Sequence, residues 1–188
     1  MRMFVEKPVL IPRVETEGLC ELALQAMKSK ESFSFLDLGC GSGCISLYLL
    51  KNTQCSGLAI DYCDAAVELT KRNARKLLGP KWFKRLTVVK ANVLEFQPKG
   101  KFDLVVSNPP YIPSESIKSL EKQVKNFESK KALDGGENGT SLIRFIMEKD
   151  WVAEGGCLCM EVDSSHTFLQ GELFKDQFGR NRYLKLTK

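Results

Sequence analysis

Four adjacent residues have side-chain types that can hold a planar amino group: Asn108, Pro109, Pro110 and Tyr111. The prolines fix φ and lack N–H donors, so the turn is stiff and its carbonyl oxygens are free to accept. We expect Asn108 Oδ1 and the Pro109 carbonyl to accept both hydrogens of an –NH2 group, while Tyr111 stacks on its plane. The nitrogen lone pair would then face a methyl sulfonium for in-line attack, accelerated mainly by positioning. A rigid surface turn explains any one of these residues, but explains their coincidence poorly.

A glycine-rich segment lies between an apolar run and a predicted helix, and reads Asp37-Leu38-Gly39-Cys40-Gly41-Ser42-Gly43-Cys44. Because position 44 is cysteine, the segment lacks the last small residue of a dinucleotide fingerprint and suits a nucleoside without pyrophosphate. Asp61 ends the next apolar run, twenty residues after Gly41, where a carboxylate can accept from both ribose hydroxyls. Asn92 and Val93 follow a third run and are placed to contact the adenine edge. A purely structural glycine turn is the alternative, but the register with Asp61 favours a nucleoside site.

These residues all follow short apolar runs, which alternate with helical patterns. The alternation predicts a doubly wound α/β domain with a mostly parallel sheet. We expect strands at Phe33–Leu38, Gly57–Asp61, Leu86–Ala91, Phe102–Ser107, Cys157–Val162 and Tyr183–Thr187. Ligands of such sheets bind at the carboxyl ends of the strands, where the strand order reverses. The 188 residues, 43% of them hydrophobic, suit one globular domain and exclude disordered and collagen-like classes.

Helical patterns occupy the intervals between the predicted strands. One helix carries an apolar stripe made of Leu19, Leu22, Ala23, Ala26 and Met27. Another carries an apolar face made of Ile117, Leu120, Val124 and Phe127. A helix that begins with Asp64 as its cap is expected to end near Leu78. The last predicted helix runs from Ser141 to about Val152 and ends before Gly155-Gly156.

The formal charge of +5 comes from one stretch of the chain. Between Lys71 and Lys90 there are eight basic residues and no acidic ones, whereas the remaining residues include more acidic than basic side chains. Trp82 and Phe83 lie within this stretch. A basic patch with aromatic side chains can contact RNA or another anionic partner. A solvated helix face followed by a loop is the commoner origin of such a charge run.

The seven cysteines are predicted to be free thiols. Their spacing lacks the paired pattern of a zinc site, and His166 is the only histidine, so we expect no metal. We interpret His166 as a helix-start residue rather than a general base. The chain has no secretory signal pattern and no apolar run long enough to span a bilayer, so no membrane partner is expected. Free thiols indicate an intracellular, reducing compartment, with mitochondrion and cytoplasm both open.

The glycine-rich segment and the Asn108–Tyr111 turn together resemble S-adenosylmethionine-dependent methyltransferases that modify planar amino or amide nitrogens. Three further stretches resemble the HemK/PrmC release-factor glutamine methyltransferases among them. These stretches are Leu10-Ile11-Pro12-Arg13-Val14-Glu15-Thr16-Glu17, Ala132-Leu133-Asp134-Gly135-Gly136-Glu137-Asn138-Gly139 and Gly179-Arg180-Asn181-Arg182-Tyr183. They are similar to the family's F/L-I-P-R-P-E-T-E segment, A-L-D-G-G-x-x-G loop and terminal G-R-x-R motif. Glu161-Val162-Asp163 with His166 is closer to the family's eukaryotic organellar branch.

The resemblance implies the class I methyltransferase fold, with S-adenosyl-L-methionine as the cofactor. As substrate it implies the side-chain amide nitrogen (N5) of the glutamine in the Gly-Gly-Gln loop of a peptide-chain release factor. Carried over position by position, the cofactor contacts are Asp37, Leu38, Gly39, Cys40, Gly41, Asp61, Asn92, Val93 and Asn108. The implied catalytic residues are Asn108, Pro109, Pro110 and Tyr111. Arg13 and Thr16 are implied to shape the mouth of the substrate pocket.

The resemblance also sets expectations for the domain organisation. Residues 1–188 are expected to form a single catalytic domain, with an N-terminal segment at 1–17 and a Rossmann-like core at 33–188. The family's N-terminal helical substrate-docking domain is expected to be absent, which would weaken partner binding more than chemistry.

Four positions depart from the family pattern. Val14 and Ser129 stand where the family has proline, and Asn92 stands where it usually has aspartate. Only four residues separate Phe174 from Gly179. We therefore expect either a shortened C-terminal edge of the sheet or a missing segment.

Two other functions stay open from the sequence. An N6-adenine methyltransferase acting on DNA or RNA would use the same Asn108–Tyr111 turn and could exploit the Lys71–Lys90 stretch. It is not expected to share the segments at 10–17 and 132–139. A degenerate cofactor-binding domain without turnover would fit the short C-terminal interval, but the intact Asp61 argues against it.

Overall fold

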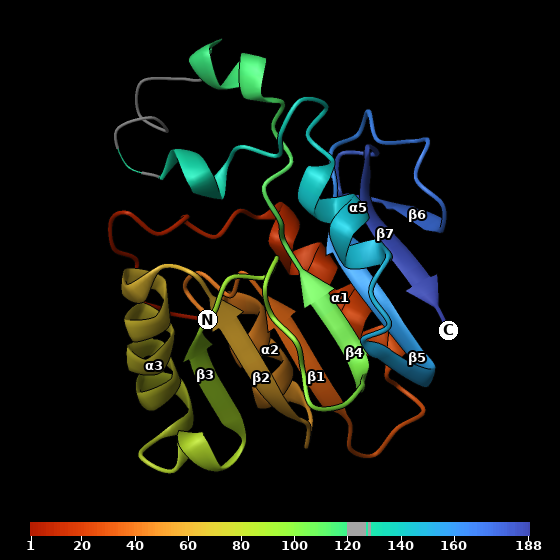
Figure 1. The fold of residues 1–188 in the computed structure, drawn as a ribbon. Helices are drawn as coiled ribbons and strands as arrows, with labels where there is room; N and C mark the ends of the chain where they lie inside the picture. The colour runs from red at the N-terminus through yellow and green to blue at the C-terminus, as the bar shows by residue number, and fades with distance from the viewer. Residues whose placement is uncertain (120–126, 128) are drawn as a thin grey trace.

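A seven-stranded sheet forms the centre of the described chain, residues 1–119, 127 and 129–188 of a computed structural model (Figure 1). Its strands are β1 (Ser34–Leu38), β2 (Ser56–Asp61), β3 (Leu86–Lys90), β4 (Phe102–Ser107), β5 (Val152–Glu161), β6 (Glu172–Lys175) and β7 (Asn181–Thr187). The order is β3-β2-β1-β4-β5-β7-β6; β1 to β5 pair in parallel, and β7 is antiparallel to both neighbours. This confirms the predicted α/β architecture, whose strand order reverses between β1 and β4.

Strand β6, at the sheet edge, is the strand that the sequence does not predict. It has four residues, of which two are exposed and two half-buried, so it lacks the continuous apolar run of a covered strand. The connection at 162–171 that precedes it forms turns and bends and contains no helix. The expected shortening therefore affects this connection and the length of β6, while the described sheet still has seven strands.

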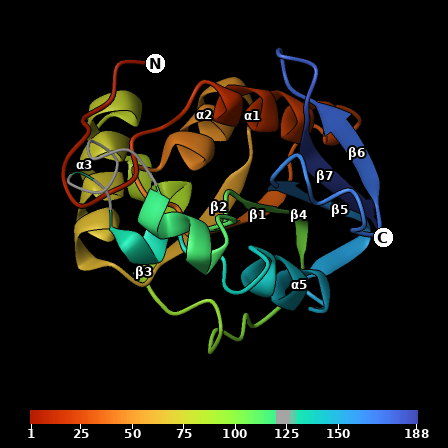
Figure 2. The same cartoon turned by 90° about the horizontal axis from the view of Figure 1, so that it is seen from above.

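Helices cover the two faces of the sheet unequally (Figure 2). On one face lie α1 (Glu15–Ala26), α2 (Cys44–Asn52) and α3 (Asp64–Leu78), and on the other lies α5 (Ser141–Met147). Strands β1 and β4, in the middle, are buried over most of their length, which is why their sequences are apolar. Within the described part of the chain, no helix has the length and apolarity needed to cross a membrane.

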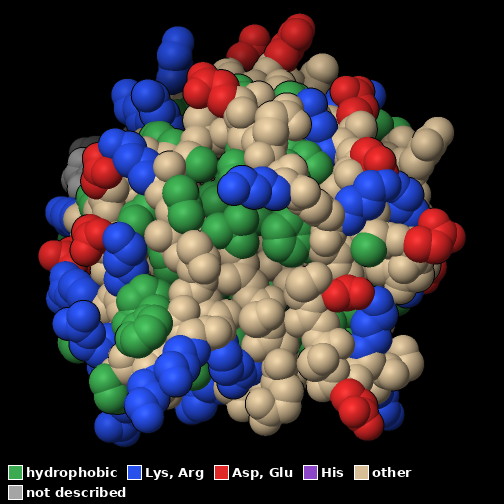
Figure 3. All heavy atoms as spheres, turned by 60° about the horizontal axis from the view of Figure 1, so that its bottom comes forward, with side chains coloured by type: hydrophobic (Ala, Val, Ile, Leu, Met, Phe, Trp, Pro, Cys, Tyr) green, Lys and Arg blue, Asp and Glu red, His purple; other side chains and the backbone are tan. Residues whose placement is uncertain are grey.

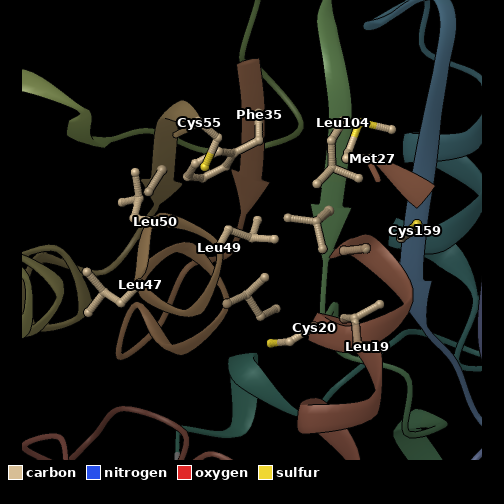
Figure 4. Close-up of a cluster of buried hydrophobic side chains, with 14 of the residues drawn as sticks. Leu19, Cys20, Met27, Phe35, Leu47, Leu49, Leu50, Cys55, Leu104 and Cys159 are labelled. Carbon is tan, nitrogen blue, oxygen red and sulfur yellow. The ribbon is translucent and has the colours of Figure 1, made fainter. Parts of the chain in front are cut away.

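The larger core lies between the sheet and α1 to α3 (Figure 4). Leu19 of α1 and Leu49 of α2 belong to one cluster with Phe35 of β1 and Leu104 of β4, and all four are fully buried. The predicted stripe of α1 is confirmed at Leu19, Leu22, Ala23 and Met27, which are buried, while Ala26 is half-buried. Each fully buried leucine stabilises the fold by about 2 kcal/mol. This core fixes the start of α1 and the start of α2, and both carry residues predicted to form the site.

Two predicted helix ends are wrong. The N-cap of α3 is Cys63, so Asp64 is its first helical residue and not its cap. Helix α5 ends at Met147, because Val152 already begins strand β5. The glycine pair at 155–156 lies inside that strand, beside a register shift against β4. It therefore marks an irregularity within a strand rather than the end of a helix.

The segment after β4 is described only in part. Residues Ser114–Ser119 form a 3-10 helix in which Ile117 is buried. Phe127 is exposed. Leu120 and Val124 lie outside the described residues, so the apolar helix face predicted there stays a prediction.

Helix α1 is attached to the last strand of the chain. Tyr183 Oη donates a 2.7 Å hydrogen bond to the Glu15 carbonyl oxygen, and a Cβ on Gly18 would overlap the Tyr183 ring. Tyr183 is itself paired with Glu161 at the end of β5. These contacts hold the first turn of α1, with Thr16, beside the carboxyl end of β5.

Candidate active site

The carboxyl ends of the central strands open into a cavity of about 930 Å³. Its lining comes from the ends of β1, β2 and β4, the N-terminal segment and the loop before α5. The predicted site residues on this lining are Thr16, Leu38, Gly39, Cys40, Gly41, Asp61, Asn92, Val93, Asn108, Pro109 and Pro110. Asp37, Arg13 and Tyr111 are not on it. The structure thus brings the predicted nucleoside and amide sites together in one cavity.

The turn after β1 forms one wall of the cavity. Gly39, Gly41 and Gly43 have φ values of +73°, +56° and +82°, which residues with a side chain rarely adopt. Thr70 of α3 supports the turn, because its Oγ1 donates a 2.9 Å hydrogen bond to the Gly41 carbonyl oxygen. A Cβ on Gly43 would lie 2.9 Å from the Thr70 methyl carbon. A ligand in the cavity can therefore approach bare main chain.

Asp61 ends β2 and continues this wall. Its Oδ2 accepts a 3.0 Å hydrogen bond from Gly41 N, and its Oδ1 accepts a 2.9 Å hydrogen bond from Cys63 N. Burial raises the pKa of the Asp61 carboxyl, although these hydrogen bonds oppose the shift. A carboxylate has about four acceptor sites, so Asp61 keeps capacity for donors in the cavity. This capacity fits a pair of ribose hydroxyls.

Asn92 and Val93 follow β3 and line the cavity as predicted. Val93 is buried, whereas Asn92 is exposed. Asn92 Oδ1 accepts a 3.2 Å hydrogen bond from Leu94 N. Asn92 Oδ1, the predicted acceptor for an adenine amine, therefore already accepts one hydrogen bond from the main chain. Its second lone pair remains for a ligand.

Asp37 lies behind the glycine turn and does not reach the cavity lining. Its Oδ2 accepts hydrogen bonds of 2.6 Å from Ser46 Oγ and 3.2 Å from Ser46 N. Burial raises the pKa of Asp37 to about 6, and the charge of Asp61 adds to the shift. The side chain thus joins the end of β1 to the start of α2, and supports the turn that a ligand would touch.

The turn after β4 forms a separate wall. Ser107 Oγ donates a 2.8 Å hydrogen bond to the Leu38 carbonyl oxygen, which joins the ends of β4 and β1. Pro109 is buried, and Asn108 is half-buried with its Nδ2 donating a 3.2 Å hydrogen bond to Thr16 Oγ1. This bond uses one hydrogen of the Asn108 amino group, and Oδ1 is left as the acceptor for a ligand.

Tyr111 does not line the cavity in this structure. Its ring packs against the buried cluster between the sheet and α5, with the Arg182 guanidinium 5.8 Å from the ring centre. Its hydroxyl donates a 3.0 Å hydrogen bond to Glu161 Oε1. Burial raises the pKa of Tyr111 well above its usual value, and the Glu161 charge raises it further. Tyr111 therefore supports the turn from behind in this structure.

The loop at 132–139 is bonded to the same turn through main-chain atoms. Ile112 and Asp134 form an isolated parallel bridge. Ile112 N donates to the Leu133 carbonyl oxygen at 3.0 Å, and Gly135 N donates to the Ile112 carbonyl oxygen at 2.8 Å. The loop and the Asn108 turn consequently hold a fixed position relative to each other.

Known proteins resemble this chain in sequence. A family model described as a methyltransferase small domain matches residues 16–137. A release factor glutamine methyltransferase from Agrobacterium fabrum is 33% identical over 97% of this chain and 68% of its own length. The chain belongs to the release factor glutamine methyltransferase family. A human member, named MTRF1L release factor glutamine methyltransferase, is 37% identical over 85% of this chain and 51% of its own length.

The chain spans between about half and about two thirds of the length of these two family members. Its fold also resembles a solved structure, a SAM-dependent methyltransferase from Geobacter sulfurreducens in complex with S-adenosyl-L-homocysteine. The two share 16% identity with a TM-score of 0.51, over 83% of this chain and 49% of the other. At this identity the likeness concerns the fold alone.

The three stretches that resemble release factor glutamine methyltransferases take different places around the cavity. Parts of 10–17 and 132–139 lie on the lining, whereas 179–183 lies behind it, at the start of β7. Within the first stretch Thr16 is buried and faces the cavity, and Arg13 is half-buried beside it.

Glu161 supports the candidate active site, but the sequence did not predict it as a site residue. It ends β5, is 1% exposed and accepts 3.0 Å hydrogen bonds from Thr16 Oγ1 and Tyr111 Oη. An acidic residue at the carboxyl end of an apolar strand was the available signal, as it was for Asp61. Further residues on the lining come from connections that carry no periodic pattern, among them Tyr62, Ser129 and Lys131.

His166 is buried in a turn, so its interpretation as a helix-start residue is wrong. Its Nδ1 accepts a 3.3 Å hydrogen bond from Asp163 N, and it also bonds to the main chain of Asn138. It does not line the cavity. Its contacts join the connection after β5 to the 132–139 loop.

Proposed function

We propose that this chain transfers a methyl group from S-adenosyl-L-methionine to the side-chain amide nitrogen (N5) of the glutamine in the Gly-Gly-Gln loop of a peptide-chain release factor. The observation that carries this proposal is the placement of Asp61 and Asn108 on separate walls of one cavity. A carboxylate suited to ribose and a turn suited to a planar amide match a reaction between a nucleoside cofactor and an amide. Family membership supports the substrate class.

The residues around the glycine turn fit the cofactor. Main chain without Cβ atoms borders the cavity, and Asp61 keeps acceptor capacity for two ribose hydroxyls. We assign cofactor contacts to Leu38–Gly41, Asp61, Asn92–Val93 and Asn108, and a supporting role to Asp37. S-adenosyl-L-homocysteine in the Geobacter structure of the same fold supports this cofactor. When bound, S-adenosyl-L-methionine supplies an electrophilic methyl carbon.

The Asn108 turn holds the substrate amide. Asn108 Oδ1 and the Pro109 carbonyl oxygen accept the two hydrogens of the –NH2 group, and the rings of Pro109 and Pro110 keep these acceptors fixed. The bonds direct the nitrogen lone pair toward the cofactor side of the cavity. Acceptors built into a stiff turn need no reorganisation as positive charge develops on the nitrogen. Thr16 and Arg13 shape the mouth of the pocket, and stacking by Tyr111 stays a prediction.

A labelling experiment tests the substrate and the reaction together. The protein is incubated with a donor carrying a labelled methyl group and, in separate reactions, with a release factor, RNA or DNA. Mass spectrometry then maps the label. We expect one methyl group on the glutamine of the Gly-Gly-Gln loop, and none on a control factor in which glutamate replaces that glutamine.

Other outcomes of this experiment contradict the proposal. Label on the N6 atom of adenine in nucleic acid, with none on the factor, would make the chain an N6-adenine methyltransferase. Measurable binding of S-adenosyl-L-homocysteine with no label on any of the three substrates would make it a cofactor-binding domain without turnover.

We further propose that the Lys71–Lys90 stretch contacts RNA or a ribosomal surface. It forms the exposed side of α3 and the 3-10 helix η1 (Trp82–Lys84), and Figure 3 shows Lys and Arg side chains with hydrophobic ones among them on that side of the molecule. Phe83 is 61% exposed. Part of the stretch serves the fold, since Arg85 donates to two main-chain carbonyl oxygens. The contact surface is therefore centred on η1.

Salt-dependent RNA binding tests this surface. Lys81→Glu with Lys84→Glu should weaken binding of a ribosomal RNA fragment and flatten its dependence on salt, because each basic contact to phosphate releases counterions. Lys99→Glu, in the exposed connection before β4, is the control. Equal RNA binding by the double variant and the control would contradict the contact.

The organisation and location of the chain are also proposals. The described residues share one sheet, which supports a single catalytic domain over 1–188. All seven cysteines are free thiols, which supports a reducing compartment, with mitochondrion and cytoplasm as the two candidates.

A further inference from the structure

Three hydrogen bonds connect the Asn108 turn to a buried carboxylate. Asn108 Nδ2 donates to Thr16 Oγ1 at 3.2 Å, and Thr16 Oγ1 donates to Glu161 Oε2 at 3.0 Å. Tyr111 Oη donates to the other oxygen of Glu161, also at 3.0 Å. The four residues, which we call the hydrogen-bond chain, come from α1, from the turn after β4 and from the end of β5. Its geometry is therefore a product of the tertiary fold.

The direction of each bond in the hydrogen-bond chain follows from the donors that are present. An ionised carboxylate only accepts, so Thr16 must direct its single hydroxyl hydrogen to Glu161. Toward Asn108 the hydroxyl oxygen can then only accept, so the Asn108 amide must present its NH2 group to Thr16. Oδ1 is consequently left for the substrate. In the opposite orientation the Asn108 NH2 group would face the substrate NH2 group, and neither could accept.

The groups around Glu161 act on its charge in opposite directions. Glu161 is 1% exposed, and this burial raises the pKa of its carboxyl. The Thr16 and Tyr111 hydroxyls and the Arg182 guanidinium favour the ionised form, whereas the charge of Glu15 opposes it. Two further titratable groups respond to the charge of Glu161: Tyr183 on β7 and Cys44 at the start of α2.

Arg182 is held where it can balance the charge of Glu161. It is 8% exposed, and its NH1 donates a 3.1 Å hydrogen bond to the Val162 carbonyl oxygen. Its Nε lies 3.6 Å from Asp176 Oδ2, and its NH1 lies 3.9 Å from Asp163 Oδ2. The G-R-N-R stretch at 179–182, for which the family resemblance implied no function, thereby supports the end of β5.

We propose that Glu161 is a positioning residue whose carboxylate, acting through Thr16, fixes the side-chain amide of Asn108 with Oδ1 toward the substrate. Glu161 does not line the cavity and so touches neither reactant. The catalytic consequence rests on the proposed function, whereas the orientation of the amide does not. Kinetic measurements test the first, and NMR of the Asn108 amide tests the second.

A pair of substitutions at Thr16 tests the connection. Thr16→Val keeps the shape of the side chain but removes its hydroxyl, while Thr16→Ser keeps the hydroxyl. A misplaced acceptor costs about 100-fold in turnover, so we expect kcat for release-factor methylation to fall by about that factor in Thr16→Val. Thr16→Ser should restore most of it, and calorimetry should find unchanged affinity for S-adenosyl-L-homocysteine in both. Equal kcat in the two variants would overturn the proposal.

The pH dependence of kcat gives a readout that a merely structural role would not change. A protonated Glu161 can donate to Thr16, Thr16 then donates to Asn108, and the Asn108 amide turns over. We therefore expect kcat at saturating cofactor to fall as the pH is lowered through a pKa above the usual glutamate value. Glu161→Gln should lower kcat and abolish this part of the profile. An unchanged acid limb in Glu161→Gln would contradict the proposal.

NMR of the Asn108 side-chain amide tests the orientation without turnover. The two amide proton signals are identified by their disappearance in Asn108→Ala, and are followed in protein without cofactor. We expect their shifts and exchange rates to change in Thr16→Val and on acidification in the unsubstituted protein, but not on acidification in Glu161→Gln. Such changes without any release-factor methylation would reject the proposed function and keep the positioning role. If the protein methylates the release factor but the Asn108 signals are the same in Thr16→Val, the proposed function is kept and the positioning role of Glu161 is rejected.

Discussion

The two walls of the cavity are stabilised by different kinds of contact. The wall after β1 and β2 is largely main chain, and Asp61 accepts hydrogen bonds from the backbone N–H groups of Gly41 and Cys63. The wall after β4 is aligned by side chains, with Asn108 bonded to Thr16 and Thr16 to Glu161. A main-chain wall tolerates most substitutions other than at its glycines and at Asp61, whereas a side-chain wall fails when one member loses its polar group. Cofactor binding and turnover should therefore separate under mutation.

The largest separation is expected at Asn108. Asn108→Ala removes an acceptor for the substrate amide, and loss of one preorganised polar group at a reacting centre lowers kcat by up to about 1,000-fold. Affinity for S-adenosyl-L-homocysteine, measured by calorimetry, should fall far less than kcat, because Asn108 is one of several assigned cofactor contacts and those on the other wall are intact. Persistent turnover in this variant would show that the amide is held elsewhere.

The support behind the main-chain wall should depend on pH. Burial raises the pKa of Asp37 to about 6 from 3.8, so the folded state binds this proton more tightly than the unfolded chain. The stabilisation is present below about pH 4 and is lost as the pH rises through about 6, a change of about 3 kcal/mol in the free energy of unfolding. Asp37→Asn should flatten this part of the urea-unfolding profile.

Asp150→Asn, at an exposed carboxylate paired with Lys101, is the control for that measurement. It should leave the slope between about pH 4 and 6 as in the unsubstituted protein, because an exposed ion pair contributes about 0–1 kcal/mol. If Asp37→Asn keeps the same slope as this control, Asp37 is not the group that titrates.

At Asp61 we expect a smaller effect than at Asn108, and one that lowers cofactor affinity rather than kcat. Asp61→Asn removes the charge and one acceptor from the ribose side, and a hydrogen bond to a charged group contributes about 1.5–3 kcal/mol, so cofactor affinity should fall by about 10- to 100-fold. At saturating cofactor kcat should change much less, since Asn108 is untouched. Asp64→Asn, on the exposed first turn of α3, is the matched control. A loss confined to kcat would reverse the roles of the two walls.

The smallest effect separates close packing from backbone strain in the glycine turn. Gly43 and Gly39 have φ values of +82° and +73°, but a Cβ would approach Thr70 to 2.9 Å at Gly43 and meet nothing within 4 Å at Gly39. Gly39→Ala should cost about 1 kcal/mol in the free energy of unfolding from strain alone. Gly43→Ala should cost about 1 kcal/mol more from overpacking, measured by urea unfolding. Equal costs would mean that Thr70 moves aside.

Much of the fold could be predicted from local sequence. Central strands are covered on both faces and therefore read as apolar runs, and α3 ends at Leu78 as predicted, although its cap is Cys63 and not Asp64. Strand β6 was missed because an edge strand with half-exposed residues has no such run. The end of α5 was misplaced because the glycine pair at 155–156 breaks a strand, and a glycine signal alone does not tell the two cases apart.

The site divides in the same way. Residues that directly follow a strand, such as Asp61 and Asn108, were predicted to meet because carboxyl ends of parallel strands share one edge. The contacts of Thr16 with Glu161 join positions 145 residues apart, and no spacing rule connects them. The Asp37 side chain bonds to Ser46 instead of facing the cavity, and the Tyr111 hydroxyl bonds to Glu161. Both contacts likewise depend on tertiary neighbours and cannot be read from local sequence.

The attachment of α1 to β7 has a consequence for how the protein is made. Tyr183 contacts Glu15 across 168 residues, and Thr16 is positioned by β5. During synthesis the glycine turn and its supporting helices can collapse while the ribosome is still translating the rest, since amino-terminal parts fold first. The substrate wall has to wait for the final strand to emerge. In a nascent chain halted before Tyr183, the cofactor wall would therefore be formed, whereas the substrate wall at Asn108 would not yet be aligned.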